Sequence, residues 1–363
     1  MIPVSQPFLP PKEEYDQYIS QLWDTKWLTN QGIYVQQLES ELKKYCQCSS
    51  LFYVNNGTSA LHLAIKGLGI KNEVITTPFS FVATTTSILW ENCTPVFVDI
   101  DPTTFCIDAE KIEAAITDRT EAILATHVFG IPCEVERIEE IARKHNLLVI
   151  YDAAHAFGVQ YKGRSLLTYG DLSTISFHAT KLFHTVEGGA IMNNTENSEL
   201  DQTIQLMRNF GFVGENYAMI GLNGKNSEFH AAMGLCNLKY VDALIEKRKE
   251  LSEAYRKLLG DKRETPDIMK STKYNYAYYP ILFETEGLLL QVQKNLRDNQ
   301  IASRRYFYPS LNTLPYVTSA HKCPVSEDIS RRILCLPLYS DLTLEEVEWI
   351  AAIVKEGQKA VIV

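Results

Sequence analysis

The sequence contains no long hydrophobic run and no cluster of basic residues. None of its apolar stretches reaches the roughly 18 residues that suggest a membrane-spanning helix. Its 363 residues carry a net charge of −9 without a run of lysine or arginine, so the chain is poorly suited to binding a nucleic-acid backbone. A small basic pocket could still take a nucleotide ligand. The N-terminus has no basic segment followed by an apolar one, and no signal peptide is expected.

Several short motifs are also absent. Without a Gly-x-Ser-x-Gly elbow, a hydrolytic triad is not indicated, and without Gly-x-Gly-x-x-Gly after the first strand, neither is a nicotinamide-binding fold. The 8 cysteines are scattered, and Cys46 and Cys48 are too close together for a zinc knuckle and have no second pair. We therefore expect no metal site, and free thiols in a reducing cytoplasm.

Short apolar strands alternate with helices over roughly the first 230 residues. This alternation predicts an α/β fold with a mainly parallel sheet covered on both faces, in which ligands lie at the carboxyl ends of the strands. The pattern then changes to a long helix and a second group of elements. Because the chain exceeds one average domain, we expect a large domain over 1–235 and a smaller C-terminal α/β domain over 236–363. The expected strands are 51–54, 73–77, 95–100, 122–128, 147–151, 174–177, 274–283 and 334–338, and the expected helices include 108–117, 228–259 and 287–299.

Three polar side chains follow two neighbouring predicted strands. Asp152 ends one apolar strand, while Ser176 ends the next and is followed by Lys181 and by Glu187-Gly188-Gly189. Such a set can hold pyridoxal 5'-phosphate (PLP) at three points. The lysine amine can form a Schiff base with the aldehyde, the aspartate can pair with the protonated ring nitrogen, and the serine can bind the phosphate. Taken alone, a lysine at this place is more often a surface residue, and the neighbouring groups favour the functional interpretation.

Further residues suit the same cofactor. The turn at Gly57 joins a strand to the start of a helix, where backbone N–H groups and the helix dipole favour a phosphate. Phe81 follows a strand and a proline, and it is the aromatic residue we expect to stack on the flat ring. His155 lies three residues after Asp152 and could touch the ring or its phenolic oxygen.

Seven segments together resemble the DegT/DnrJ/EryC1/StrS family of PLP-dependent sugar aminotransferases over nearly the whole chain. The resemblance implies the aspartate-aminotransferase type of fold (fold type I) and a homodimer with shared active sites. The matching segments are 56–61, 78–84, 95–101, 152–155, 170–171, 176–181 and 187–190.

The resemblance also implies a role for each matching residue. Lys181 would be the lysine that bonds to the cofactor, and Asp152 would pair with its ring nitrogen. Asn223 would reach the phosphate of the neighbouring subunit. His155 stands where many family members have glutamine. The other implied cofactor contacts are Gly57, Thr58, Ser59 and Ser176 at the phosphate and Phe81 at the ring, and the substrate contacts we expect are His184, Glu187, Arg304, Tyr306 and Tyr308.

Within the family, the segment around Lys181 most resembles enzymes that aminate C4 of dTDP-4-keto-6-deoxyglucose. The implied reaction moves an amino group from L-glutamate to give dTDP-4-amino-4,6-dideoxyglucose, a precursor of O-antigen and other surface sugars. Amination at C3 of a 3-keto sugar remains open, and Asn312 replaces the usual histidine of the nucleotide-sugar region. A sugar dehydratase of the same fold would carry histidine in place of Lys181. A PLP-free relative would not need lysine, aspartate and serine together.

Overall fold

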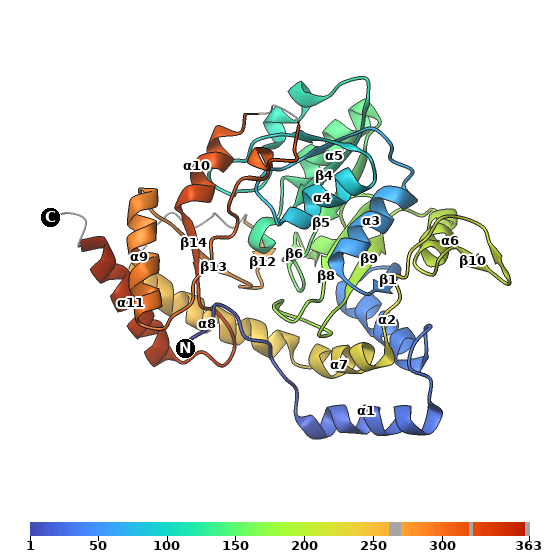
Figure 1. The fold of residues 1–363 in the computed structure, drawn as a ribbon, viewed down its shortest axis with the longest axis horizontal. Helices are drawn as coiled ribbons and strands as arrows, with labels where there is room; N and C mark the ends of the chain where they lie inside the picture. Colours follow the sequence, from blue (N-terminus) through green and yellow to red (C-terminus); the bar gives the residue numbers. More distant parts are fainter. Residues whose placement is uncertain (261–269, 319–321, 360–363) are drawn as a thin grey trace.

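A seven-stranded, mainly parallel sheet forms the centre of the computed structural model, which describes residues 1–260, 270–318 and 322–359. Helices cover both of its faces (Figure 1), as the strand and helix alternation predicted. The strand order is β1 (Ser50–Val54), β9 (Gly189–Asn193), β8 (Leu172–Ser176), β5 (Leu148–Asp152), β4 (Thr120–Thr126), β2 (Glu73–Thr76) and β3 (Thr94–Phe97). Within this sheet only β9 runs antiparallel to its neighbours.

The two faces of the sheet build two separate hydrophobic clusters. Successive residues of a strand point to opposite faces, so Val74 and Ile75 of β2 belong to different clusters. On one side the sheet packs against α3 (Gly57–Gly67), α4 (Val82–Trp90) and α6 (Ser198–Met207). On the other it packs against α2 (Ile33–Cys46), α5 (Val135–His145) and α7 (Glu228–Leu238), with α1 (Lys12–Thr25) outside α7. Burial on both faces explains the continuous apolar strands.

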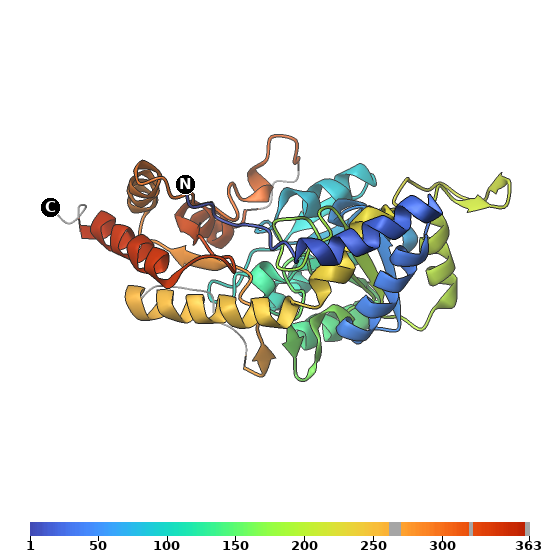
Figure 2. The same cartoon turned by 90° about the horizontal axis from the view of Figure 1, so that it is seen from below.

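The C-terminal elements gather around a further cluster, which includes Ile2 from the N-terminus. Figures 1 and 2 show α8 extending from the sheet body toward this group. The cluster supports a smaller domain, whose boundary at residues 235/236 stays a proposal. The elements around this cluster are α8 (Val241–Leu259), β13 (Tyr279–Leu282), α9 (Glu286–Asp298), β14 (Ile333–Leu336) and α11 (Leu344–Lys359). The remaining C-terminal helix, α10 (Pro324–Arg332), instead places Ile329 in the cluster that α2, α5 and α7 share with the sheet. None of the helices in the described ranges is long and apolar enough to cross a membrane.

Three predicted elements differ from the structure. The helix expected over 228–259 is two helices, α7 and α8, which are separated by a turn at Lys239 and Tyr240. The helix expected over 108–117 is two short 3₁₀ turns, Ala109–Lys111 and Glu113–Ala115. Of the strand expected over 274–283, only Tyr279–Leu282 forms a strand, β13, which pairs with β14.

Smaller strand pairs complete the fold, and the sequence patterns did not predict them. A three-stranded sheet joins β6 (Gln160–Tyr161) to β7 (Arg164–Ser165) and to β12 (Thr272–Lys273). A hairpin of β10 (Phe212–Val213) and β11 (Asn216–Tyr217) projects from the body (Figure 2). Strands of two residues are too short to show an alternating pattern.

Asp99, just after β3, ties the sheet to α10. Its carboxylate oxygens accept hydrogen bonds from the backbone N–H groups of Val325 and Ser326, each at 2.9 Å. These are the first turn of α10, where a carboxylate satisfies free donors and interacts favourably with the helix dipole. Only 8% of Asp99 is exposed, so water cannot easily replace it.

Replacing Asp99 by alanine should lower the free energy of unfolding by about 2 kcal/mol, because buried N–H groups of α10 lose their acceptor. Asp99→Asn is the matched control. It keeps a capping oxygen and should lose less than about 1 kcal/mol. Denaturant unfolding of both variants measures the difference, and equal stability of Asp99→Ala and the natural protein would refute the role of this contact.

Candidate active site

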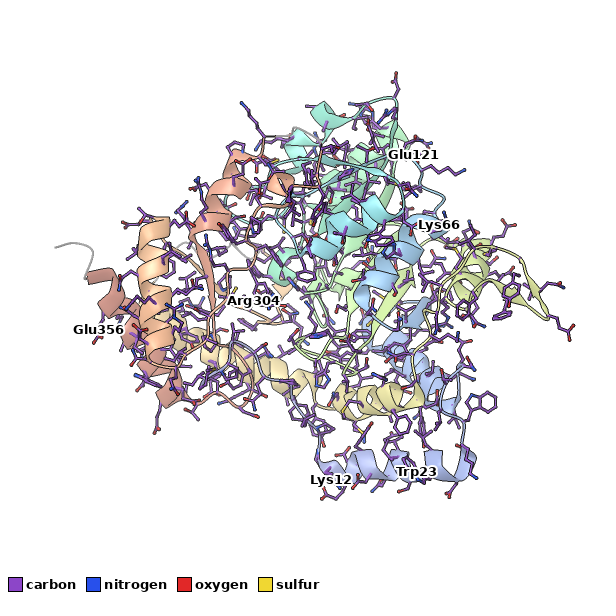
Figure 3. The ribbon with its side chains drawn as sticks, viewed as in Figure 1. Lys12, Trp23, Lys66, Glu121, Arg304 and Glu356 are labelled. Carbon is purple, nitrogen blue, oxygen red and sulfur yellow. The ribbon has the colours of Figure 1, made fainter. Side chains whose placement is uncertain are left out.

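A cavity of about 390 Å³ lies at the carboxyl ends of the parallel strands. Ser176 and Asp152 reach it from the ends of β8 and β5, and Gly57 reaches it from the turn after β1. Arg304, labelled in Figure 3, comes from the C-terminal segment. The predicted site residues that line this cavity are Gly57, Thr58, Phe81, Asp152, His155, Ser176, Lys181, Glu187, Arg304 and Tyr306.

Lys181 lies in the loop after β8, with most of its surface covered. Its Nζ contacts the hydroxyl of Tyr278 at 3.3 Å. Burial lowers the pKa of the Lys181 amine, and the negative charge of Asp152 opposes that shift. A lysine with a lowered pKa has more of the neutral amine, which is the nucleophilic and proton-accepting form.

Asp152 is buried at the end of β5 and faces the cavity. The hydroxyl of Thr84 donates to its Oδ2 at 2.7 Å, and the N–H of Ala154 donates to its Oδ1 at 3.1 Å. Burial raises the pKa of Asp152, while these two hydrogen bonds and the charge of Lys181 act in the opposite direction. The carboxylate makes no direct ion pair within the described residues. A cation that enters the cavity would therefore stabilise the ionised form of this carboxylate.

The backbone fixes the tautomer of His155. The N–H of Phe129 donates to its Nδ1 at 3.1 Å, so Nδ1 is the acceptor and the ring proton resides on Nε2. Burial lowers the pKa of His155 well below its usual value, and the charge of Lys181 adds to the effect. The ring stacks on Phe307 with centroids 5.6 Å apart. His155 is thus a rigid, neutral N–H donor at the cavity wall.

The far end of the cavity is formed by the turn into α3 and by Ser176. A Cβ on Gly57 would lie 2.9 Å from the Cβ of Ser176, so only glycine allows this close approach. Asn56 caps α3 by accepting the N–H of Ser59 at 2.8 Å. Gly57 and Thr58 occupy the first turn of the helix, where N–H groups have no partner within the helix. This end of the cavity suits an anion.

The mouth of the cavity carries one aromatic face and opposite charges. Phe81 is 50% exposed beside it. Glu187 lies 3.5 Å from the Nε2 of His178, another cavity residue. The guanidinium of Arg304 lies 4.8 Å above the ring of Tyr306 and makes no ion pair within the described residues. An unpaired cation at the mouth favours anionic ligands.

Four predicted residues lie outside the cavity wall. His184 is buried, its Nε2 bonds to the carbonyl of Phe8 at 2.7 Å, and its ring contacts Asn237, so its polar atoms are already engaged. The N–H of Ser59 is used by Asn56, while Tyr308 stacks under Arg305 on the surface. The side chain of Asn223 is exposed and accepts from Lys225 at 3.1 Å.

The sequence patterns missed two residues that touch the central groups, Thr84 on Asp152 and Tyr278 on Lys181. Thr84 lies inside a short helix among other small polar residues. Tyr278 is one of four tyrosines at positions 274 to 279, and the sequence alone could not rank them. Both contacts depend on tertiary packing across many residues of chain.

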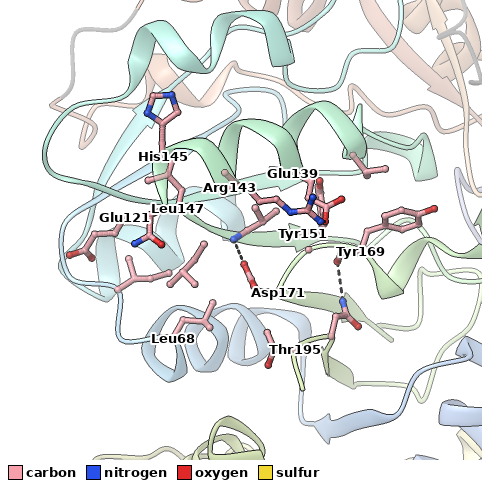
Figure 4. Close-up of a pocket in the computed structure, with 18 of the residues that line it drawn as sticks. Leu68, Glu121, Glu139, Arg143, His145, Leu147, Tyr151, Tyr169, Asp171 and Thr195 are labelled. Atoms are coloured by element: carbon pink, nitrogen blue, oxygen red, sulfur yellow. Dashed lines mark hydrogen bonds and ion pairs between the residues drawn. The ribbon is translucent and has the colours of Figure 1, made fainter. Parts of the chain in front are cut away.

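A larger hollow of about 1120 Å³ lies at the amino ends of the same strands (Figure 4). Its charged side chains already make ion pairs or hydrogen bonds with neighbouring residues. Asp171 accepts the N–H of Val149 at 2.7 Å, and Arg143 forms an ion pair with Glu139. It contains none of the predicted site residues, and the carboxyl edge of the sheet remains the candidate active site.

Comparison with known proteins identifies the family of the chain. Residues 11–355 match the model of the DegT/DnrJ/EryC1/StrS aminotransferase family. The chain is 42% identical to a dTDP-4-amino-4,6-dideoxy-D-glucose transaminase of Shigella dysenteriae over 97% of this chain and 98% of that protein. It is 34% identical to a GDP-perosamine synthase of Escherichia coli O157:H7 over 98% of each chain.

Solved structures show the same fold. The chain superimposes on DesI, crystallised in the presence of its TDP-sugar product, with a TM-score of 0.93 and 29% identity over 99% of this chain and 95% of that one. It superimposes on Helicobacter pylori PseC, an aminotransferase of pseudoaminic acid biosynthesis, with a TM-score of 0.91 and 28% identity over 99% of each chain. The fold predicted from the sequence is confirmed, and the chain belongs to the DegT/DnrJ/EryC1/StrS aminotransferase family.

Proposed function

We propose that the cavity holds PLP. The buried carboxylate of Asp152 has no direct ion pair among the residues that the structure describes, and it would gain a cationic partner in a protonated pyridine nitrogen. Lys181 borders the same cavity, and the close approach of Gly57 to Ser176 at the start of α3 forms a cradle for a phosphate. The exposed ring of Phe81 offers a stacking surface. The observation that carries the proposal is this convergence of lysine, carboxylate and phosphate cradle on one cavity.

Bound there, PLP would supply an electron sink for moving an amino group. The residues of the chain divide the remaining work. Lys181 would bond to the cofactor and carry a proton between the reacting carbons, which its lowered pKa favours. Asp152 would keep the ring nitrogen protonated. His155, whose Nδ1 accepts from Phe129, would have its Nε2–H free to donate to the ring substituents. Gly57, Thr58 and Ser176 would hold the phosphate, and Ser59 would support them through the turn that Asn56 caps.

The proposed reaction transfers the amino group of L-glutamate to the 4-keto carbon of dTDP-4-keto-6-deoxyglucose, giving dTDP-4-amino-4,6-dideoxyglucose for surface polysaccharides such as O-antigen. The similarity to two dTDP-4-amino-4,6-dideoxy-D-glucose transaminases, each at 42% identity, supports this substrate. Arg304 and Tyr306 at the mouth suit an anionic sugar nucleotide, with Glu187 available to accept sugar hydroxyls. All 8 cysteines are free thiols, which fits the cytoplasmic location we propose.

An assay of sugar preference tests the reaction. The protein with PLP and glutamate is given the 4-keto sugar nucleotide or its 3-keto isomer, and NMR determines the position and configuration of the new amine. We expect turnover of the 4-keto substrate with the amine equatorial at C4. Preferential turnover of the 3-keto isomer would establish the C3 alternative instead, and preference for a GDP-linked 4-keto sugar would correct the nucleotide.

We also propose a homodimer in which Asn223 completes the phosphate site of the neighbouring subunit. Its side chain is exposed and does not line the cavity of its own chain. The backbone of its segment is held beside the phosphate turn, since Asn55 donates to the carbonyl of Asn223 at 3.1 Å. A dianionic phosphate needs several donors, and a second chain could supply one more.

Mixed subunits test this arrangement. Asn223→Ala and Lys181→Ala proteins should each be nearly inactive, yet heterodimers formed by unfolding and refolding the mixture should recover about a quarter of the natural activity, because half the dimers have one intact site. Mixing Lys181→Ala with Asp152→Asn is the control, since both side chains belong to one cavity and every site keeps a substitution. Absence of recovery in the first mixture, or a monomeric mass at working concentration, would contradict the shared site.

A further inference from the structure

Lys181 lines two hollows of very different size. One is the cavity of about 390 Å³ that we propose for the cofactor. The other is a crevice of about 10 Å³, lined by Leu182, Asn275 and Tyr278 among others. Such a crevice holds one water molecule at most. When the lysine amine is not bonded to a ligand in the large cavity, the hydroxyl of Tyr278 at 3.3 Å is the side chain that bonds it.

The ring of Tyr278 is held firmly in this place. Its centroid lies 4.5 Å from the ring of His155 and 5.5 Å from that of Tyr306, two residues of the cavity wall. A third ring, Phe129, packs at 5.7 Å. The position of the tyrosine hydroxyl is therefore fixed by packing. The hydrogen bond forms when the lysine side chain brings its amine to that position.

The backbone beside Tyr278 is fixed to both halves of the chain. Buried Asn275 donates to the carbonyls of His155 and Phe157 at 2.8 and 2.9 Å, which ties the segment to the loop after Asp152. Arg248 of α8 donates to the carbonyl of Ala277 at 3.1 Å. The tyrosine thus has a defined position relative to the cavity, although it belongs to the second half of the chain.

We propose that Tyr278 is a positioning residue that holds the free amine of Lys181 beside the cofactor cavity. This inference rests on the proposed function and adds a resting place for the amine during the part of the cycle in which it is not bonded to the cofactor. Burial raises the pKa of Tyr278, so the phenol stays neutral and can accept from an ammonium or donate to an amine.

The hydrogen bond should favour the protonated lysine. Bonds to a charged group are about twice as strong as bonds between neutral groups, so the phenol oxygen stabilises the ammonium more than its O–H stabilises the amine. Loss of the hydroxyl should therefore lower the pKa of Lys181 further below its usual value. The other titratable or charged groups that face this amine are Asp152, His155, Arg304 and Tyr306.

Tyr278→Phe keeps the ring packing and removes only the hydroxyl. Tyr274→Phe is the matched control, because Tyr274 lies in the same segment and its hydroxyl donates to the carbonyl of Phe129 at 2.8 Å, away from the lysine. The first readout is the pH dependence of Lys181 labelling by an amine reagent in full-length protein stripped of cofactor. The midpoint should move to lower pH in Tyr278→Phe only.

Two further readouts separate positioning from stability. In the loaded protein, kcat should fall about tenfold in Tyr278→Phe while KM for glutamate and for the sugar nucleotide stays the same, because one hydrogen bond to a charged group is lost. In a Lys181→Ala background, Tyr278→Phe should leave the affinity for PLP unchanged, whereas it alters the capture rate of PLP when Lys181 is present.

An unchanged labelling midpoint in a folded Tyr278→Phe protein would overturn the inference, as would equal effects of Tyr278→Phe and Tyr274→Phe. If Tyr278→Phe unfolds, as judged by thermal denaturation, Tyr278→Met supplies a second variant that fills the space without a hydroxyl. The pH midpoint of Lys181 labelling in that variant then tests the inference in the same way. Failure of the natural protein to bond PLP through Lys181 would instead refute the proposed function, so the two failures are distinct.

Discussion

Lys181→Ala should lose turnover by at least about 10²–10⁴-fold, the range that general-base catalysis alone contributes. The loss should be larger still, because the variant also lacks the amine that bonds to the cofactor. The cavity keeps its carboxylate, its stacking ring and its phosphate cradle, so we expect the variant to bind PLP without a covalent bond. Steady-state assays and equilibrium dialysis measure the two properties.

Lys181→Arg is the control for charge. It keeps a cation beside Asp152 and removes the primary amine, so it should be as inactive as Lys181→Ala while remaining at least as stable. Transamination by either variant at a rate near that of the natural protein would exclude Lys181 as the proton carrier.

Asp152→Asn should slow amino transfer from glutamate by about 10²-fold or more, the usual cost of removing one preorganised electrostatic partner. The shape of the site should survive. Thr84 can reverse its hydrogen bond and accept from the amide, because its hydroxyl also has Ser80 as a partner at 2.7 Å. Rapid mixing of the loaded protein with glutamate measures the rate, and an unchanged rate would reject Asp152 as the partner of the ring nitrogen.

The same substitution should not destabilise the protein stripped of cofactor at neutral pH. Burial raises the pKa of Asp152 above its value in the unfolded chain, so the unfolded state loses its proton first as the pH rises. The contribution of this group to stability is therefore greatest below about pH 4, the unfolded value, and is lost as the pH rises through the folded value. Asparagine does not titrate, so the Asp152→Asn variant does not lose this stability as the pH rises. Thermal unfolding at pH 5 and pH 8 should show an advantage for Asp152→Asn that does not shrink at the higher pH.

The sequence predicted the sheet well because its strands are buried on both faces. Segments such as Val74-Ile75 and Val149-Ile150 are continuous apolar runs between turn residues, which is a strong local signal. The break at Tyr240 was not predictable, since no proline or glycine occurs at the junction of α7 and α8. The hairpin at 212–217 has strands of two residues, below the length at which alternation is visible.

The candidate site was predictable where its residues are close to strand ends in the sequence. Asp152, Ser176 and Lys181 follow neighbouring strands, and the parallel order of β5 and β8 brings them to one edge. His184 shows the limit of this reasoning. It lies three residues after Lys181, yet the turn directs it into the core, where it bonds to the carbonyl of Phe8 from the distant N-terminus. Tyr278 reaches the lysine from 97 residues away, so no local pattern could indicate it.

The most direct test of the central claim is to locate the cofactor bond. The full-length protein is loaded with PLP, reduced with borohydride and digested, and the modified peptide is identified by mass spectrometry. We predict loss of the visible absorbance band on reduction and a single modified residue, Lys181, with no labelling of Lys181→Ala. Labelling at another lysine, or no reducible band at saturating PLP, would contradict the account.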